Sequence, residues 1–365
     1  MGGPLYRGPD GARGCRHAPR CRAAVVAVYS GRSRDDVAGV GAAHAERASR
    51  AARNPNAGVR QAMTDGDGSL ESGQAIGDYV LDEQLDLGPF SETWSAYHQD
   101  DVDREEALGI VVATHPLYVQ WMADQQTFAL PVNHKNLLLA NEIDVSQDPP
   151  HLVYDLIPGD TLAQLIANGL MFDQRGVLAI VRQITAGVAA LHAAGEFHGA
   201  LTPSTVMLAE SGEVLVLDTE TARITRDISL FVSRSPTAPP QLKTELLPYL
   251  APEERAQPGR TDPRGDIYSI GMLYYTLLTH EPPPTDTPLG EDALTGQPIQ
   301  VSSLILECTA PLDLRITDGA ALLARLARLA QILPASDPDS GEVEEEEAEE
   351  VEEAFLDSDE YITSD

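Results

Sequence analysis

The stretch His198-Gly199-Ala200-Leu201-Thr202-Pro203-Ser204-Thr205-Val206-Met207-Leu208 decides the fold of this 365-residue chain. Its polar first part leads into the apolar run Val206–Leu208, which is typical of a short buried strand. Upstream, apolar residues recur at three- and four-residue spacing over positions 177–191, which predicts an amphipathic helix. Downstream, the run Glu213–Leu217 predicts a second strand that ends at Asp218. The order is therefore a helix, a polar loop, two strands and an acidic turn.

This stretch resembles the catalytic loop of protein kinases, whose pattern is His-Arg-Asp-Leu-Lys-Pro-x-Asn before an apolar strand. The framework residues of that pattern are present, namely His198, Leu201 and Pro203. The reactive residues are replaced: Ala200 stands for the catalytic base, Thr202 for the phosphate-neutralising lysine and Thr205 for the metal-binding asparagine. Alanine has no titratable group and cannot take a proton from a substrate hydroxyl. The resemblance thus implies the kinase fold together with loss of its chemistry.

Six further landmarks resemble the kinase pattern in the family's order. They are Asn133–Leu137, His151–Leu162, Asp218–Arg223, Tyr249–Glu253, Asp262–Gly271 and Arg315. With the catalytic loop, they are similar to bacterial eukaryotic-like serine/threonine protein kinases over roughly residues 77–330. The resemblance implies an α+β, bilobal protein-kinase-like fold, with a small β-rich N-lobe at 77–157 and a larger helical C-lobe at 158–330.

The hydrophobic pattern predicts individual elements within that span. Strands are expected at 79–85, 93–97 and 107–113, a poorly marked helix at 115–131, and amphipathic helices at 177–191, 267–278 and 322–329.

The Gly-rich loop of the family aligns with Leu85–Trp94 and retains one glycine of three, Gly88. Asp86 and Ser91 fill the other two places. Backbone amides approach phosphates closely only where no side chain intervenes, so this phosphate cradle is expected to be damaged.

The lysine of the third strand aligns with Gly109 or Ile110, and the sequence leaves both registers open. In the family this lysine pairs with a glutamate of helix C. That glutamate aligns near Gln125 or Gln126. Arg104 is the one plausible substitute cation. A cation is therefore missing, while Asp86 and Glu220 add carboxylates near the place of a triphosphate. Two unit charges about 4 Å apart near a protein surface interact by about 4 kcal/mol, which opposes nucleotide binding.

Other positions fall into two groups by resemblance. The remnants of the nucleotide pocket are Leu85, Gly88, Tyr154, Asp155, Leu156, Leu208 and Asp218. The residues expected to hold the fold are His198, Glu253, Asp266 and Arg315, with Glu253 paired to Arg315 and Asp266 accepting from catalytic-loop amides. Asp218 is also a weak metal-ligand candidate, but Thr205 replaces the second ligand, which favours a turn residue at 218.

The segment from Asp218 to Glu253 corresponds to an activation segment and contains the hydroxyls of Ser229, Ser233, Ser235 and Thr237. Gly199 replaces the arginine that would bind a phosphate there, so self-activation by phosphorylation is not expected. The hydroxyls remain candidate substrates for an active partner kinase.

Charge and cysteine content exclude several classes of function. The formal net charge is −32, which argues against nucleic acid or an anionic membrane surface as partner. The 3 cysteines are too few and scattered for a disulfide framework, so a reducing cytoplasm is the expected location. No apolar run of membrane-spanning length is expected.

Both ends of the chain differ in composition from the middle. Residues 1–62 form an Arg-, Ala- and Gly-rich leader with 11 arginines and 4 acids, and Met63 is a plausible alternative start. Residues 63–76 are an acidic linker. Residues 331–365 form an acidic tail expected to be disordered, since positions 336–365 contain 15 acids and no basic residue.

These observations predict a non-catalytic scaffold or allosteric partner in phosphorylation signalling, with no cofactor and another protein as partner. That partner is either an active kinase or a basic protein bound by the tail. The alternative is a divergent serine/threonine kinase or ATP sensor that binds ATP and magnesium through Asp218. Other losses aside, the absence of a general base alone costs about 10²–10⁴ in rate.

Overall fold

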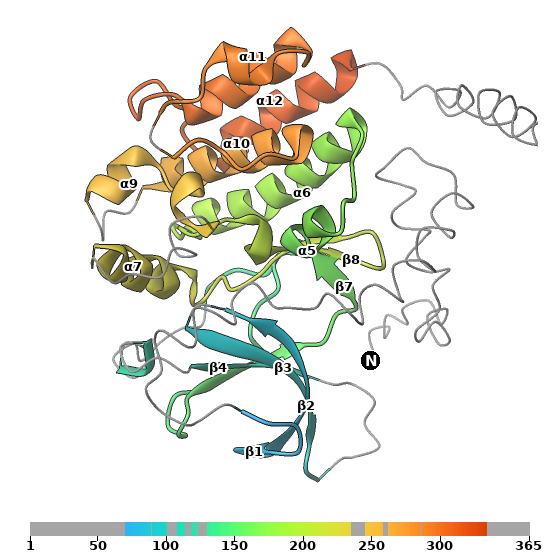
Figure 1. The fold of residues 1–365 in the computed structure, drawn as a ribbon, viewed down its shortest axis with the longest axis vertical. Coiled ribbons are helices and arrows are strands. Elements are labelled where there is room, and N and C mark those ends of the chain that lie inside the picture. The colour runs from blue at the N-terminus through green and yellow to red at the C-terminus, as the bar shows by residue number, and fades with distance from the viewer. Residues whose placement is uncertain are drawn as a thin grey trace, which may run out of the picture.

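The strands and the helices of the chain separate into two lobes (Figure 1). The structure is a computed structural model, and it describes residues 70–88, 90–100, 108–113, 118–120, 122, 130–234, 245–257, 262–285 and 287–333. An antiparallel sheet forms the small lobe, at the bottom of Figure 1, and a stack of helices forms the large lobe above it. The α+β, bilobal architecture predicted from the sequence is therefore confirmed.

The small lobe is a six-stranded sheet in the order β1-β2-β3-β4-β6-β5, with every neighbouring pair antiparallel. Its strands are β1 Ala75–Ile76, β2 Tyr79–Leu87, β3 Ser91–His98, β4 Leu108–Ala113, β5 Glu142–Asp144 and β6 His151–Asp155. The strands predicted at 79–85, 93–97 and 107–113 correspond to β2, β3 and β4.

The two faces of this sheet carry separate hydrophobic clusters, because successive side chains of a strand point to opposite faces. One cluster contains Ile76, Tyr79, Leu81, Trp94, Ala96, Ile110 and Val153. The other contains Phe90, Tyr118, Met122, Leu152, Tyr154, Ile224 and Ile228. The second cluster draws residues from well beyond the sheet, so this face is the one that meets the rest of the chain.

A second, three-stranded sheet links the lobes, with the order β7-β8-β9. Its strands are β7 Gly159–Thr161, β8 Val206–Ala209 and β9 Val214–Val216. The 3-10 turn η1, Pro203–Thr205, leads into β8. The deciding stretch of sequence thus forms the loop and strand expected of it.

Four helices of the large lobe, α5, α6, α10 and α12, begin at polar side-chain caps. Thr161 caps α5 and Asp173 caps α6, each accepting a hydrogen bond from a backbone amide of the first turn. The helices and 3-10 turns are α5 Leu162–Ala167, α6 Gln174–Ala193, α7 Ala222–Ser233, η2 Leu247–Tyr249, α9 Pro252–Ala256, α10 Pro263–Thr279, η3 Glu291–Leu294, α11 Ile299–Thr309 and α12 Gly319–Ile332. The helices predicted at 177–191, 267–278 and 322–329 correspond to α6, α10 and α12.

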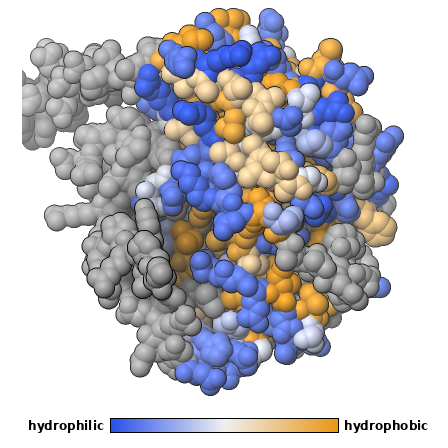
Figure 2. Space-filling model, turned by 180° about the vertical axis from the view of Figure 1, so that it is seen from behind, coloured by the Kyte–Doolittle hydropathy of each residue, from blue (hydrophilic) through white to orange (hydrophobic). Residues whose placement is uncertain are grey.

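The core of the large lobe surrounds α6 and α10. Ten residues of α6 are buried, which fits its pattern of apolar positions. Within the described ranges, α6 is the one helix long and apolar enough to cross a bilayer, a feature the sequence analysis did not expect. More than half of that window is buried inside the protein, as in the core helix of a globular domain. Figure 2 shows hydrophobic and hydrophilic residues interspersed over the rear face.

The helix α7 was not predicted from the sequence. It occupies the first part of the activation segment and lies where the two lobes meet (Figure 1). Of the helix predicted at 115–131, the structure describes helical residues at 118–120 and 122. Tyr118 and Met122 are one helical turn apart and both join the cluster that contains Ile224 and Ile228 of α7. Packing between these two segments therefore stabilises α7.

Candidate functional site

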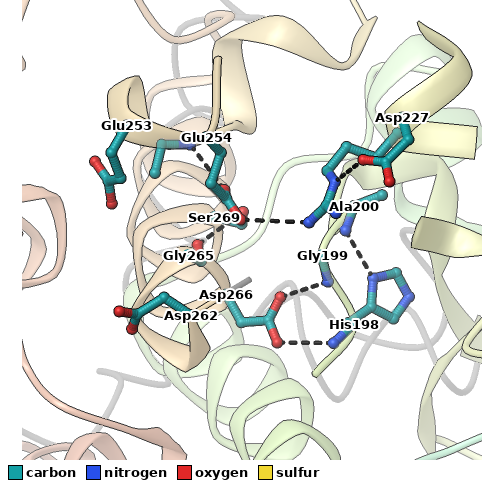
Figure 3. A network of polar contacts seen from close by, with 12 residues as sticks. His198, Gly199, Ala200, Asp227, Glu253, Glu254, Asp262, Gly265, Asp266 and Ser269 are labelled. Atoms are coloured by element: carbon teal, nitrogen blue, oxygen red, sulfur yellow. Dashed lines mark hydrogen bonds and ion pairs between the residues drawn. The ribbon is translucent and has the colours of Figure 1, made fainter. Parts of the chain in front are cut away.

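Asp266 of α10 binds the backbone of the loop that corresponds to the catalytic loop (Figure 3). The Asp266 carboxylate accepts hydrogen bonds from the backbone amides of His198 at 2.8 Å and Gly199 at 2.7 Å. It also lies 3.1 Å from His192 Nε2. The buried His198 ring donates from Nε2 to the carbonyl of Leu217 at 2.8 Å, and burial lowers its pKa. Asp266 and His198 thus fix the loop backbone and are not placed for chemistry.

Ala200, at the position of the catalytic base, is enclosed by hydrophobic side chains. It is only 2% exposed. It belongs to a cluster with Ala222 and Leu230 of α7 and with Leu246 and Leu250, which precede α9. A substrate hydroxyl would have to displace α7 to reach this position. The sequence predicted loss of the base, but it did not predict that the position becomes part of a core.

The two threonines that replace polar catalytic residues are used locally. The Thr205 hydroxyl accepts a hydrogen bond from the amide of Thr202 at 2.9 Å. It lies 3.3 Å from the carbonyl of Ala200 and 3.2 Å from that of Thr202, either of which accepts its proton. This hydroxyl therefore closes the turn before β8.

Asp218 lies at the turn between β9 and α7. Its φ is 57°, in the left-handed region that aspartate tolerates better than most residues. Its carbonyl accepts hydrogen bonds from the amides of Thr221 at 2.9 Å and Ala222 at 2.7 Å, which starts α7. Burial, with added repulsion from Asp86 and Glu220, raises the pKa of the Asp218 carboxyl to about 7. Asp218 thus sits among negative charges.

Glu220 replaces the small glycine of the family segment and joins the lobes. Its carboxylate accepts from the amide of Ala140 at 2.8 Å and from the Tyr154 hydroxyl at 3.3 Å. Tyr154 lies on β6 and is buried. Burial raises the pKa of Glu220. Tyr154, predicted to line the nucleotide pocket, is therefore hydrogen-bonded to Glu220 of the protein itself.

The sheet register distinguishes the two positions left open for the missing lysine. Ile110 pairs with Trp94 and Val153 and shares their hydrophobic cluster. Gly109 pairs with Tyr154, so position 109 is on the face that meets Glu220. Of the two positions, 109 is therefore the one on the face of Tyr154 and Glu220, and its glycine has no charge.

A hydrophobic side chain at the end of the segment that corresponds to the Gly-rich loop packs against α7. Phe90, at the loop end, is 1% exposed and packs with Ile224 and Ile228 of α7. Asp86 pairs with Thr93 across β2 and β3, and Leu85 beside it is exposed. The loop thus closes on α7.

The other predicted pocket residues do not converge on one site. Asp155 is exposed and its Oδ1 accepts from Asn141 at 2.8 Å. Leu156 is exposed, whereas Leu208 is buried in the main core of the large lobe. The predicted positions Gln125, Gln126 and Arg104, with Ser235 and Thr237, lie outside the described residues.

Glu253 of α9 and Arg315 form a two-point ion pair in the large lobe. Arg315 Nη1 lies 2.5 Å from Glu253 Oε1 and Nη2 lies 3.2 Å from Oε2. Arg315 also donates to the carbonyls of Ala310 at 2.9 Å and Arg264 at 3.0 Å. Its guanidinium stacks 5.0 Å from the ring centre of Tyr268. These contacts tie α9 to the segment before α12.

The polar contact between α7 and α9 was not predicted from the sequence. Arg226 Nη1 lies 3.5 Å from Glu254 Oε1, and Arg226 Nε donates to Asp227 Oδ1 at 2.9 Å. Burial raises the pKa of Glu254 to about 7, and nearby Asp266 adds to the effect while Arg226 opposes it. The i, i+4 spacing of Ile224 and Ile228 was the available signal for a helix here.

The residues present do not fit a magnesium-bound nucleotide. Across the described ranges, no three His, Cys, Asp or Glu side chains are grouped to hold a metal ion. The Thr205 hydroxyl is hydrogen-bonded within its own turn. The charged groups that act on Asp218 are the carboxylates of Asp86 and Glu220, whereas a nucleotide would require a cation there.

The raised pKa of Asp218 gives a testable pH dependence. A carboxyl whose pKa is raised on folding stabilises the fold fully at acid pH, and this stability is lost as pH rises through 7. Asp218→Asn keeps the size and the tolerance for positive φ but carries no charge. We expect it to raise the free energy of unfolding by about 2 kcal/mol at pH 8 and by less as pH falls to 4. Denaturant titration at both pH values, with chelator present, measures this. A destabilised Asp218→Asn at pH 8 would contradict it.

Comparison with known proteins identifies the family of this chain. Residues 107–311 match the protein kinase domain family, so the chain belongs to the protein kinase family. The relatives found are bacterial serine/threonine kinases, as the sequence motifs indicated. The chain is 30% identical over 278 residues to the serine/threonine-protein kinase PknL of Mycobacterium tuberculosis, covering 70% of this chain and 67% of that protein.

Two further matches are less similar in sequence. PknB of Mycolicibacterium smegmatis is 25% identical over 213 residues, which cover 56% of this chain and 33% of PknB. Among solved structures, the apo form of PpkA-294 matches with a TM-score of 0.55 at 19% identity, covering 71% of this chain and 99% of that one. At this identity the match shows the fold alone.

Proposed function

We propose that this protein is a non-catalytic member of the protein kinase family, which acts as a scaffold or allosteric partner by binding another protein. The observation that carries the proposal is the burial of Ala200 in a hydrophobic cluster with residues of α7. A base is absent, and the space in front of its position is filled by the chain itself.

The surroundings of Asp218 support the same proposal. Binding a triphosphate requires positive charge, yet the pKa of the Asp218 carboxyl is raised by desolvation and, in addition, by repulsion from Asp86 and Glu220. Like charges at short range cost several kcal/mol where water is excluded. We therefore propose that the protein uses no ATP and no magnesium.

The structure narrows which hydroxyls a partner kinase can modify. Ser229 is 2% exposed and lies on the buried side of α7, so it is not accessible while α7 is folded. Ser233, at the helix end, is partly exposed and donates to the carbonyl of Leu230 at 3.0 Å. We propose Ser233 as the candidate within the described part of the activation segment.

Thermal melting with ATP and magnesium tests the proposal. A ligand that binds only the folded state raises the melting temperature by mass action. We expect a shift below about 1 °C at ATP concentrations that shift an active kinase domain by several degrees. Labelled-phosphate transfer to a generic protein substrate should match the background without enzyme. A metal-dependent shift that is lost in Asp218→Ala would instead favour a nucleotide sensor.

A pull-down experiment can identify the partner protein and the part of the chain that binds it. Pull-down with the full chain, compared with a chain lacking residues 331–365, separates binding by the kinase-like domain from binding by the acidic tail. We propose that the domain carries the binding. Loss of all partners on deleting the tail would contradict this proposal.

A further inference from the structure

The helix α7 contacts both lobes through two different sides. Ile224 and Ile228 pack with Phe90 and Tyr118 of the small lobe. Ala222 and Leu230 pack with the catalytic loop and with Leu246 of the large lobe. A 12-residue helix is only marginally stable alone in water, so α7 depends on these contacts.

A buried charge on α7 adds a specific contact to this packing. Arg226 is 1% exposed and is among the largest fully buried side chains of the described chain. Its guanidinium meets Glu254 of α9, which is itself 3% exposed. The Glu254 carboxylate also accepts from the amide of Ala251 at 3.3 Å. A buried charge is tolerated only when it is paired. Arg226 is the cation beside Glu254, whereas Arg226 itself also donates to Asp227, whose side chain is 30% exposed.

Two glycines make the space for this pair. A Cβ atom at Gly199 would lie 2.8 Å from Arg226 Nη1, and Gly199 has a φ of 80°. A Cβ atom at Gly265 of α10 would overlap the Glu254 carboxylate. Figure 3 shows Gly199, Gly265 and Glu254 in the same polar network. Real Cβ atoms do not approach other atoms this closely, so side chains at 199 and 265 are incompatible with the pair in its present position.

We infer that the Arg226–Glu254 ion pair is a latch that holds α7 between the lobes, with Arg226 supplying from α7 the guanidinium that position 199 lacks. The latch keeps Ala200 covered and the small lobe docked on α7. The spacing of the lobes is therefore set by a helix of the chain itself and does not require a bound ligand.

Hydrogen exchange of the full chain tests the latch. In Arg226→Met, Glu254 is buried without its partner, and removal of one member of such a pair is strongly destabilising. We expect the α7 amides to exchange at least about 100-fold faster, close to the rate of an unfolded segment, while α10 and α12 remain protected. At pH 8, above the pKa of about 7 of the Glu254 carboxyl, Glu254→Gln preserves the shape but removes the charge and should give the same pattern.

A matched control lies one turn earlier on the same helix. Arg223 pairs with Glu196 at 3.1 Å, but both side chains are about one-third exposed. Arg223→Met should change α7 exchange by less than about 3-fold, since exposed ion pairs contribute little. The latch is overturned if α7 stays protected in Arg226→Met and Glu254→Gln. It is equally overturned if α7, α10 and α12 lose protection together, which would mean a general loss of stability.

Gly265→Ala provides a test that leaves both charges in place. Alanine is favoured over glycine in a helix, so this change would ordinarily stabilise α10. We expect it instead to lower the melting temperature and to expose α7 to exchange, and to raise the melting temperature in a Glu254→Ala background. A stabilised Gly265→Ala in the wild-type background would contradict the latch. These readouts measure opening of α7 and are independent of whether phosphate transfer is ever detected.

Discussion

Restoring an aspartate at the position of the catalytic base, Ala200→Asp, is expected to destabilise the protein by about 3 kcal/mol at pH 8 and to create no phosphate transfer. Ala200 is enclosed by Ala222, Leu230, Leu246 and Leu250, none of which offers a partner for a carboxylate. A charge buried among hydrophobic side chains loses its hydration without compensation. Chemical denaturation at pH 8 and labelled-phosphate transfer measure the two parts of this prediction.

Ala200→Asn separates the effect of charge from that of size. It has nearly the volume of aspartate but carries no charge at any pH, so we expect a smaller loss, about 1–2 kcal/mol. The difference between the two variants should narrow at pH 4, where an aspartate in such a place is neutral. An Ala200→Asp protein that keeps wild-type stability would show that the position is open to water. That result would remove the main support for a non-catalytic function.

Removing the arginine that pairs with Glu253, Arg315→Met, is expected to lower the free energy of unfolding by about 3–5 kcal/mol. Arg315 is 5% exposed and holds Glu253 together with two backbone carbonyls. Methionine fills much of the same volume but leaves the Glu253 carboxylate and the carbonyls without their donor. A urea titration followed by circular dichroism measures the loss.

Two control variants frame this result. Arg315→Lys keeps the charge but cannot donate from two parallel N–H groups, so an intermediate loss of about 1–2 kcal/mol is expected. Arg325 pairs with Glu307 at 3.3 Å, with both side chains about half exposed. Arg325→Met should change stability by no more than about 0.5 kcal/mol. Equal losses in Arg315→Met and Arg325→Met would contradict the structural role of the buried pair.

The lobes and the large helices could be predicted because their signals are local and long. The apolar positions of α6 repeat from Val177 to Leu191, so chance alone does not produce them. The predicted 115–131 helix was weak for the opposite reason, and only part of it falls within the described residues. The lysine position remained ambiguous because strand alternation fixes a face only once the register is known, and the pairing of Gly109 with Tyr154 supplies it.

By itself, the sequence determined the family, the order of the elements and the replacement of the reactive residues, since each of these is written in a few adjacent positions. The surroundings of these positions are visible only in the folded chain. Arg226 meets Glu254, and Ala200 meets Leu250, across long stretches of chain. Contacts of that kind leave no local pattern, because a buried charge and a short helix depend on partners that only the folded chain brings to them.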